Sequence, residues 1–510
     1  GDKANATLTL PSGEVRHFEI ELAVDGDADW WAPCDLGPKP TGKLTLTVDR
    51  VPEEVDLAKL VRFGDKLLAA DDLYHEALRP QFHFSTRRGW INDPNGLVWH
   101  DGEWHLFYQH NPYGVQWGNM HWGHAVAPDL LHWSELDEAL YPDPLGPMFS
   151  GSAVIDEQRT SGLGKGKEPP LVAIYTASGA QPCQCIAVSS DRGRTFTKYE
   201  KNPVLPHIIG GNRDPKVIWY APQSKWVMAL YLDGEDFALF ESKDLKAWTK
   251  LCDVKVPGCS ECPEFFEIGL EGQPGEKRWV FYGGNGRYLV GRFDGKTFTP
   301  ESGPHLMHHG NCWYASQTYN GVPAKDGRRI LVAWGQVNLP SMPFNQQMAF
   351  PIELTLHPTA DGPRLHSAPA REIAKLRKTT HRLPSAAIAE GSTPIAGAKG
   401  GLYDIELTLT PGAAEQVGLD VRGFAVTYEP AKSRLTVNGC GADVKLRDGQ
   451  LKLRLLVDRA SIEAWAQDGE VYIPAQAVAG PERQSLALTA KGTGAKLASG
   501  VVYELASIWK

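Results

Sequence analysis

The sequence has little of several features that mark particular classes of protein. Its 510 residues include only 8 cysteines, too few for a disulfide-built scaffold of this length. No apolar run is long and uncharged enough to span a membrane. The formal net charge of −9 provides no basic surface for phosphates, which argues against nucleic acid and against anionic membranes as partners. A neutral or small substrate suits this composition better.

Two cysteine pairs, Cys183 with Cys185 and Cys259 with Cys262, invite comparison with a zinc site. Their spacing differs from that of structural zinc sites, and the pairs lie about 75 residues apart without a histidine pair. We interpret them as small buried residues and expect neither metal nor cofactor. The first residues, Gly1-Asp2-Lys3-Ala4, lack the charged head and apolar stretch of a signal peptide. The compartment stays open: extracellular or periplasmic if a signal peptide was trimmed, otherwise cytoplasmic.

Alternating apolar and polar residues run through most of the chain, which is the period of half-buried strands. The length favours two to four domains. Only Val55–Phe63, Asp71–Ala77 and Pro369–Leu376 have a helical pattern. The sequence therefore predicts an all-β protein, with strands among others at Ala6–Leu10, His17–Val24, Lys43–Val48, Tyr403–Leu409, Leu451–Val457 and Ser485–Leu488.

Between about residues 85 and 350 the chain repeats at intervals of roughly 50 to 60 residues, with strands ahead of a turn in each repeat. The turn places an Asp before an aromatic residue and then Ser or Thr, at Asp129–Ser134, Asp191–Thr197, Asp244–Thr249 and Asp294–Thr299. A fifth repeat, Trp313–Thr318 with Ile330–Gln336, lacks the turn. About four strands per repeat predict a five-bladed β-propeller.

These patterns predict three domains. Residues 1–75 form a small N-terminal β-rich extension, which we expect to pack rather than to bind sugar. Residues 76–370 form the propeller, and residues 371–510, which alternate throughout, form a C-terminal β-sandwich. The segment Thr359–Gly400, rich in Pro, Ala and Gly, is expected to be a surface connector.

Three acids, each close to a proline, stand at the expected start of repeats one, three and four: Asp93, Asp214 and Glu261. The first strand of each blade lines the propeller axis, so these acids are expected to meet in one funnel. Glycosidic cleavage needs such a group of carboxyls, one ionised to attack and one protonated to release the leaving oxygen. A single Asp-Pro is more often a turn, but three in register favour a glycosidase.

The segment Trp90-Ile91-Asn92-Asp93-Pro94-Asn95-Gly96 resembles the nucleophile motif of glycoside hydrolase family 32, the β-fructosidases. Arg213-Asp214-Pro215 and Glu261-Cys262-Pro263 resemble two further motifs of that family, in the expected order. Further matches are Phe149–Ser152, Trp117–His124 and Val457–Glu463. The resemblance covers roughly residues 80–510. It implies a hydrolase that releases terminal β-fructofuranosyl units from sucrose, inulin or levan, with retention of configuration.

The resemblance also implies roles for individual residues. Asp93 is the expected nucleophile, Glu261 the acid and then base, and Asp214 the stabiliser that grips fructose hydroxyls. The sugar-binding residues implied are Asn92, Gln109, Trp117, Phe149, Ser150, Arg213 and Trp334.

Physical reasoning about these groups adds expectations on their surroundings. Asn92 and Asn95 are expected to donate hydrogen bonds that keep Asp93 ionised, and Arg213 to keep Asp214 charged. We expect Glu261 to keep its proton through an apolar setting formed by Cys259, Cys262, Phe265 and Phe266.

The sequence also departs from the family pattern. Cys312 stands where the family often has an acid near the pocket, and Ile352 replaces the arginine of another motif. His121 and His124 are interpreted as structural residues. Three alternatives stay open: a related propeller glycosidase for arabinose or xylose, a fructosyltransferase with the same active site, and a non-catalytic fructan-binding protein. The sequence leaves the oligomeric state undetermined.

Overall fold

A computed structural model of the chain describes residues 3–23, 30–34, 36, 41–53, 55–68 and 70–509. The predicted all-β class is confirmed, because the helical segments among the described residues are all short 3-10 turns: η1 (Leu57–Lys59), η2 (Ala70–Asp72), η3 (Ala221–Gln223), η4 (Arg371–Leu376) and η5 (Pro430–Lys432). No helix in this part of the chain is long and apolar enough to cross a bilayer. The expected helix over Val55–Phe63 is therefore wrong, since only η1 forms there.

The propeller consists of five sheets, which match in number the five predicted repeats. The first contains β4 (Gly89–His100), β5 (Glu103–Asn111), β6 (His121–Ala127), β7 (Ser134–Glu135) and the late strand β22 (Phe344–Asn345). The second contains β8 (Met148–Ile155), β9 (Leu171–Ala177), β10 (Cys183–Ser189) and β11 (Thr197–Lys198). The third contains β12 (Arg213–Tyr220), β13 (Lys225–Asp233), β14 (Asp236–Ser242) and β15 (Thr249–Lys255). The fourth contains β16 (Glu264–Gly269), β17 (Lys277–Tyr282), β18 (Arg287–Phe293) and β19 (Phe298–Leu306). The fifth contains β20 (Tyr314–Thr318), β21 (Arg329–Gly335), β23 (Gln347–Met348), β24 (Ile352–His357) and β25 (Arg364–Pro369).

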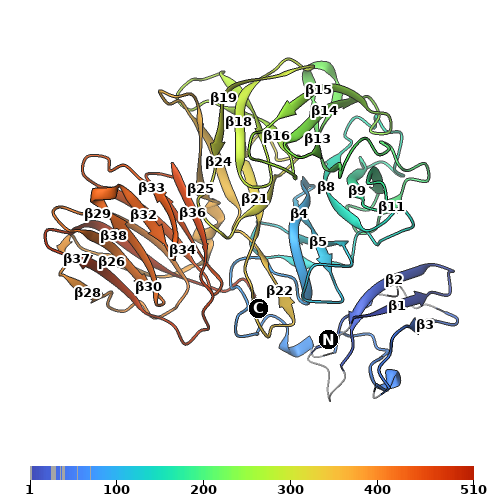
Figure 1. The fold of residues 1–510 in the computed structure, drawn as a ribbon, viewed down its shortest axis with the longest axis horizontal. Coiled ribbons are helices and arrows are strands. Elements are labelled where there is room, and N and C mark those ends of the chain that lie inside the picture. The colour runs from blue at the N-terminus through green and yellow to red at the C-terminus, as the bar shows by residue number, and fades with distance from the viewer. Residues whose placement is uncertain are drawn as a thin grey trace.

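The first strands of the five sheets form a closed ring. β4 contacts β8, β8 contacts β12, β12 contacts β16, β16 contacts β20, and β20 contacts β4. Of these strands, β4, β8 and β16 are labelled around the centre of the upper body in Figure 1. β22, from the end of this region, pairs in parallel with β4, so the first sheet is completed by a late segment of the chain. This pairing leaves no open gap between the last sheet and the first.

The repeated Asp residues hold the turns before the outermost strands, as predicted. Asp129 Oδ1 accepts hydrogen bonds from the backbone N–H groups of Leu131 and His132. Asp191, Asp244 and Asp294 accept equivalent backbone bonds from residues two to four positions further along. A carboxylate that satisfies turn N–H groups in this way explains why the motif returns in four of the sheets.

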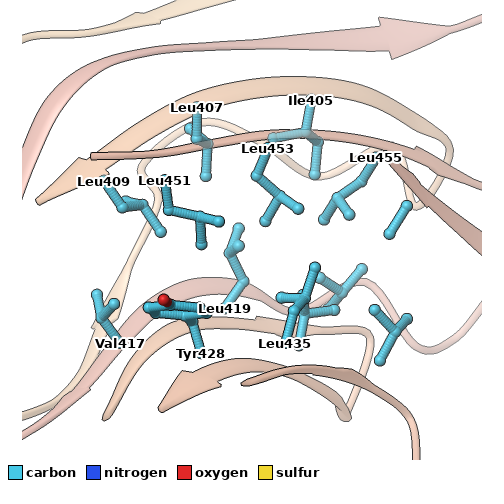
Figure 2. Close-up of a cluster of buried hydrophobic side chains, with 14 of the residues drawn as sticks. Ile405, Leu407, Leu409, Val417, Leu419, Tyr428, Leu435, Leu451, Leu453 and Leu455 are labelled. Carbon is cyan, nitrogen blue, oxygen red and sulfur yellow. The ribbon is translucent and has the colours of Figure 1, made fainter. Parts of the chain in front are cut away.

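The C-terminal region is a sandwich of two sheets, shown at the left of Figure 1. One contains β26 (Arg377–Leu383), β27 (Ala386–Ala387), β29 (Tyr403–Thr410), β34 (Leu451–Val457), β35 (Ser461–Ala466), β36 (Val471–Gln476) and β38 (Lys496–Leu505). The other contains β28 (Gly391–Pro394), β30 (Gln416–Val421), β31 (Phe424–Glu429), β32 (Arg434–Val437), β33 (Cys440–Asp443) and β37 (Leu486–Lys491). Figure 2 shows alternate apolar side chains of both sheets, such as Leu407 and Leu419, meeting in the core.

The expected surface connector over Thr359–Gly400 is wrong for most of its length. β25 completes the fifth propeller sheet, η4 follows directly, and β26 is already paired with β38 of the sandwich. Small residues and prolines in this segment lie in edge strands and in tight connections between strands. Composition alone does not distinguish such strands and connections from a surface loop.

The propeller and the sandwich share a buried polar contact as well as an apolar cluster. His83 lies between two carboxylates of the sandwich, with Nδ1 2.8 Å from Asp458 Oδ2 and Nε2 3.0 Å from Glu463 Oε1. Asp458 also accepts hydrogen bonds from the backbone N–H groups of Gln81 and Phe82. All three ionisable side chains are fully buried, so the two domains are joined by a charged cluster inaccessible to water.

The N-terminal extension contains a three-stranded sheet of β2 (Val15–Glu21), β1 (Lys3–Thr9) and β3 (Thr45–Val48). It lies beside the propeller, away from the sandwich (Figure 1). Phe18 stacks on Tyr113 with ring centroids 4.2 Å apart, and Arg16 lies over the Tyr141 ring. The end of the predicted strand His17–Val24 lies outside the described residues at Val24. The contacts agree with an extension that packs on the propeller.

Candidate active site

The three acids predicted from sequence lie at one end of the propeller axis, at the starts of inner strands. Asp93 belongs to β4, Asp214 is the second residue of β12, and Glu261 precedes β16. The thiol of Cys262 joins two of them, since Sγ lies 3.5 Å from Asp93 Oδ2 and 3.4 Å from Asp214 Oδ2. A small enclosed pocket is lined by Asp93, Ser150, Asp214, Cys262 and residues 315–317. The structure therefore brings together acids that are more than a hundred residues apart in sequence.

Asp93 receives hydrogen bonds from three side chains, one of which is the thiol of Cys262. Ser150 Oγ donates to Oδ2 at 2.6 Å, and Asn92 Nδ2 donates to Oδ1 at 3.1 Å. The Trp90 indole N–H in turn donates to Asn92 Oδ1, which orients the amide. Burial raises the pKa of Asp93 while Ser150 and Asn92 oppose this rise. Asn92 thus has its expected contact, but the other donors are Ser150 and Cys262, and the Asn95 amide lies instead beside Gly151 and Gln109.

Asp214 is the most deeply buried of the three acids, with 6% of its surface exposed. Its Oδ2 accepts a hydrogen bond from the backbone N–H of Cys262, and Arg213 Nε lies 3.7 Å away. Burial raises the pKa of Asp214 to about 7, and Arg213 lowers it only in part. The expected influence of Arg213 is present, but the loss of solvation is the larger effect.

Glu261 does not have the apolar surroundings expected from sequence. Arg213 Nη2 donates to Oε1 at 2.5 Å and Tyr314 Oη donates to Oε2 at 2.8 Å, while about a third of the side chain (32%) stays exposed. Cys259 and Phe265 pack in a separate apolar cluster, and Phe266 packs in another. The reason is that Phe265 and Phe266 lie within β16 and face its two sides, whereas Glu261 lies in the loop before that strand.

The backbone at two of the acids and at two residues beside them adopts a left-handed conformation that residues other than glycine rarely take. The φ angles of Asp214, Glu261, Cys262 and Ala315 are 63°, 62°, 43° and 50°. All four residues lie at the starts of inner strands, in or next to the pocket. Such left-handed residues cost free energy and recur where a side chain must point in a fixed direction.

The expected sugar-binding residues differ in how they relate to the acids. Asn92, Ser150 and Arg213 contact the acids, as described above. Phe149, which precedes the pocket residue Ser150, contacts Trp117, and this pair forms the rim beside the pocket, with ring centroids 5.9 Å apart and Trp117 55% exposed. Trp334 packs edge-on against both Trp90 and Tyr314. Gln109 is buried and its amide donates to the carbonyl of Met148, so it supports the strand that carries Phe149.

Two residues of the site were not singled out from sequence, Tyr314 and Trp90. Tyr314 begins β20, the inner strand of the fifth sheet, and so occupies the position that the acids occupy in other sheets. This equivalent position in the fifth repeat was the signal in the sequence that could have identified Tyr314 as a site residue. Trp90 belongs to the motif around Asp93, but nothing in its spacing indicates that it orients Asn92.

Cys312 is not near the pocket surface, contrary to the interpretation that it replaces a pocket acid. It is fully buried beside Val337, Leu339 and Ala460, and its backbone N–H donates to the carbonyl of Pro474 in β36. The neighbouring Gly310 lies so close to this carbonyl that a Cβ would be 1.7 Å from it. This segment faces the sandwich.

Among the described residues, no three His, Cys, Asp or Glu side chains are grouped so as to hold a metal ion. His121 and His124 are both buried: His121 Nδ1 contacts the carbonyl of Asn119, and His124 Nε2 lies 3.0 Å from His105 Nδ1. All eight cysteines are free. The contacts of His121 and His124 are with other parts of the propeller, as expected for residues with a structural role.

Comparison with known proteins identifies the family. A family profile described as "Glycosyl hydrolases family 32 N-terminal domain" matches residues 83–369, and "Glycosyl hydrolases family 32 C terminal" matches residues 372–504. The chain belongs to glycosyl hydrolase family 32. It is 38% identical over 491 residues to a levanase of Bacillus subtilis, an alignment that covers 86% of this chain and 72% of the levanase. It is 31% identical over 521 residues to an extracellular exo-inulinase of Aspergillus niger, covering 86% and 96%.

Solved structures of this family have the same fold. The exo-inulinase of Aspergillus awamori superimposes with a TM-score of 0.79 at 28% identity, covering 86% of this chain and all of that one. A fructofuranosidase of Schwanniomyces occidentalis gives a TM-score of 0.76 at 25% identity, covering 85% and 99%. Family 32 enzymes combine a β-propeller with a β-sandwich, and the predicted order of the two domains is confirmed.

Proposed function

We propose that the protein is a retaining exo-hydrolase that removes terminal β-fructofuranosyl units from sucrose, inulin or levan. Membership of family 32 and the levanase and exo-inulinase relatives identify the chain as a β-fructosidase hydrolase. The observation that carries the finer proposal is the convergence of Asp93, Asp214 and Glu261 at one end of the propeller axis. These three carboxyls supply what a two-step glycosidase needs.

In the proposed reaction, a carboxylate oxygen of Asp93 attacks the anomeric carbon of fructose while the bond to the leaving oxygen breaks. Glu261 gives its proton to that oxygen. Water then attacks the fructosyl ester, Glu261 takes a proton from it, and Asp93 leaves as a carboxylate. Asp214 accepts hydrogen bonds from fructose hydroxyls, and Arg213 and Asn92 add donors around the ring.

The hydrogen bonds from Ser150 and Asn92 support the role of Asp93, because they favour its ionised form against the effect of burial. The exposure of Glu261 supports its role as well. About a third of its side chain is exposed, as is required of a group that protonates the departing oxygen and then activates water.

Exo action is supported by the filled axis of the propeller, where the Lys216–Glu264 ion pair is fully buried. The acids lie near the starts of the inner strands, so a substrate reaches them from one end of the axis. A site closed at its inner end admits a chain end and not the middle of a polymer. In a time course on inulin, free fructose should appear from the first minutes while the long chains shorten slowly. Early oligosaccharides of about three to six units without free fructose would contradict exo action.

The catalytic roles are tested by substitution and rescue. Asp93→Ala and Glu261→Ala should each lower sucrose hydrolysis by several orders of magnitude with the fold intact. In Glu261→Ala, a fructosyl fluoride needs no protonation of its leaving group and should still form the intermediate. Added azide should then give β-fructosyl azide. An α product would mean that Asp93 forms no covalent bond to the sugar.

We also propose the domain division 1–75, 76–370 and 371–510. It is supported by the sheets, since β1–β3 precede residue 75, β25 ends the propeller at Pro369, and β26 begins the sandwich at Arg377.

A fructosyltransferase with the same active site would be distinguished by its products. Transfer would give longer fructans from concentrated sucrose, whereas hydrolysis gives fructose and glucose.

A further inference from the structure

A cavity of about 870 Å³ lies at the end of the propeller axis opposite to the acids. Residues from all five inner strands, or directly after them, line it, among them Trp99 of β4, Ile155 of β8, Trp219 of β12 and Glu267 of β16. The acids stand where these strands begin, whereas the cavity lies where they end. The propeller thus has an opening at each end of its axis.

The two ends are separated by a filled interior. Asp93 and Trp99 are six positions apart on β4, a span of about 20 Å along a strand. Between them lies a fully buried ion pair, Lys216 Nζ to Glu264 Oε2 at 3.0 Å. The Asn320 amide also bonds to the carbonyls of Ala153 and Val217 on two inner strands. A molecule in the cavity therefore does not reach the catalytic acids through the axis.

Two partly exposed tryptophans form apolar surface in the cavity, Trp99 and Trp219. Trp219 packs edge-on against Trp226 at 4.9 Å, and the Trp226 indole N–H donates to Thr160 Oγ1, so Trp219 is held in place. Within the described part of the chain, the indole N–H groups of Trp99 and Trp219 donate no hydrogen bond. Flat rings with a free N–H match a sugar, which has C–H faces beside hydroxyls.

The charges around the cavity favour a neutral ligand rich in hydroxyl donors. Glu157 and Glu168 are exposed at its edge, and neither has an ion-pair partner among the described residues. The cations that line the cavity are already engaged: Arg328 with Asp326, Glu353 and Glu372, and Arg329 with the carbonyl of Glu267. Carboxylates accept hydroxyl hydrogen bonds and repel phosphates or other anions.

We propose that this cavity is a second carbohydrate-binding site, which holds a fructan chain away from the catalytic acids. The proposal rests on the proposed function, because a hydrolase that removes single units from a polymer gains when the polymer stays attached between cuts. Trp219 and Trp99 stack on the sugar rings, and Glu157 and Glu168 accept hydrogen bonds from hydroxyls. Sucrose, which needs only the catalytic pocket, does not depend on this site.

The test is retention of the full chain in native gels that contain levan or inulin, with dextran gels as a control. The Asp93→Ala background prevents digestion of the polymer during the run. Trp219→Ala should weaken retention by about tenfold, as expected for loss of one stacked aromatic ring. Trp219→Phe should keep most of the retention. Glu157→Ala, an exposed change that leaves the core untouched, should also weaken it, and Phe63→Ala, which removes an exposed aromatic elsewhere, should not.

In the active background, the same Trp219 and Glu157 variants should keep kcat/KM for sucrose and lose rate on levan or inulin at low polymer concentration. The proposal would be overturned if the Trp219 and Glu157 variants were retained as strongly as the parent in levan or inulin gels. It would also be overturned if the parent were not retained in these gels, or were retained equally in dextran gels. A parallel loss of sucrose activity in Trp219→Phe and Glu157→Ala would assign a structural role instead. Failure of the proposed function is a separate result: no fructose release by the parent, whatever its retention.

Discussion

Arg213 Nη2 lies 2.5 Å from Glu261 Oε1, whereas Arg213 Nε lies 3.7 Å from Oδ2 of its sequence neighbour Asp214. One guanidinium therefore links two of the three acids. The influence of Arg213 on the carboxyls of Asp214 and Glu261 depends on where its side chain points, and adjacency in sequence does not determine that direction. A substrate that enters the pocket must share or displace the contact to Glu261, because that carboxyl has to reach the leaving oxygen.

Removing this guanidinium should change the pH dependence of the enzyme. Arg213 lowers the pKa of Asp214, which burial has raised to about 7, so Arg213→Ala should raise that pKa further. Because Asp214 acts as a carboxylate, activity is lost as pH falls through its pKa. The acid limb of kcat/KM for sucrose should move to higher pH, with about a tenfold to hundredfold loss at the optimum.

Arg213→Lys is the matched variant, since it keeps the charge but not the fork of donors. Its acid limb should move less than that of Arg213→Ala while its activity still falls. An acid limb that stays in place in Arg213→Ala would show that Asp214 does not control it.

Ser150→Ala should act on Asp93 in a similar way. The hydroxyl donates to Oδ2 at 2.6 Å and opposes the rise in pKa that burial causes. Its loss should raise the pKa of Asp93, shift the acid limb of kcat/KM upward, and lower kcat/KM by about tenfold. A smaller kcat/KM with an unchanged pH profile would assign Ser150 to sugar binding alone.

The three acids were predictable because each lies near the start of an inner strand and has a proline one or two positions further along, a pattern that is visible in the sequence. The apolar setting expected for Glu261 was wrong, since Cys259, Phe265 and Phe266 are its neighbours in sequence but turn toward the sheet interior. Partners from other sheets, such as Tyr314 and Ser150, depend on how the five sheets are arranged around the axis. Spacing alone does not determine these contacts.

In the sandwich, too, the strands could be predicted from sequence and the contacts between distant residues could not. Alternation predicts its strands, for example Tyr403–Leu409 within β29, and the motif around Asp458 resembles a motif of the family. That Asp458 and Glu463 enclose His83 from the propeller could not be read from sequence, because the contact joins residues more than 370 positions apart.

This cluster should make stability fall on the alkaline side. Burial opposes the charge on His83, but Asp458 and Glu463 raise its pKa to about 9, above an ordinary value near 6.5. The folded state therefore binds the proton more tightly, and the contribution is complete below about pH 6.5 and lost as pH rises toward 9. It amounts to about 3 kcal/mol.

The measurement is the free energy of unfolding of the wild type and His83→Gln across that pH range. The difference between the two should be largest below about pH 6.5 and should shrink toward pH 9. A difference that does not depend on pH would mean that His83 stabilises the interface by packing and not by its charge.

The last prediction concerns how the N-terminal extension affects the rim of the active site. Asn119 Oδ1 accepts a hydrogen bond from the backbone N–H of Glu19 at 2.8 Å, and Asn119 Nδ2 donates to the Glu19 carbonyl at 2.9 Å. The side chain thus pairs with β2 in both directions, two residues from Trp117. Asn119→Ala should release the loop and raise KM for inulin by about threefold, with kcat unchanged, because it removes these bonds and the bond to Asn111 Oδ1 that hold the loop carrying Trp117.

A double-mutant cycle separates this effect from a general loss of stability. Trp117→Ala alone should raise KM at least as much, and adding Asn119→Ala to it should have no further effect, since the ring that the loop positions is already gone. Glu21→Ala, an exposed change on the same strand, is the control and should leave KM unaltered. If the two effects on KM add in the double variant, Asn119 acts on the enzyme by a route that does not involve Trp117, and the extension has no influence on the rim through this loop.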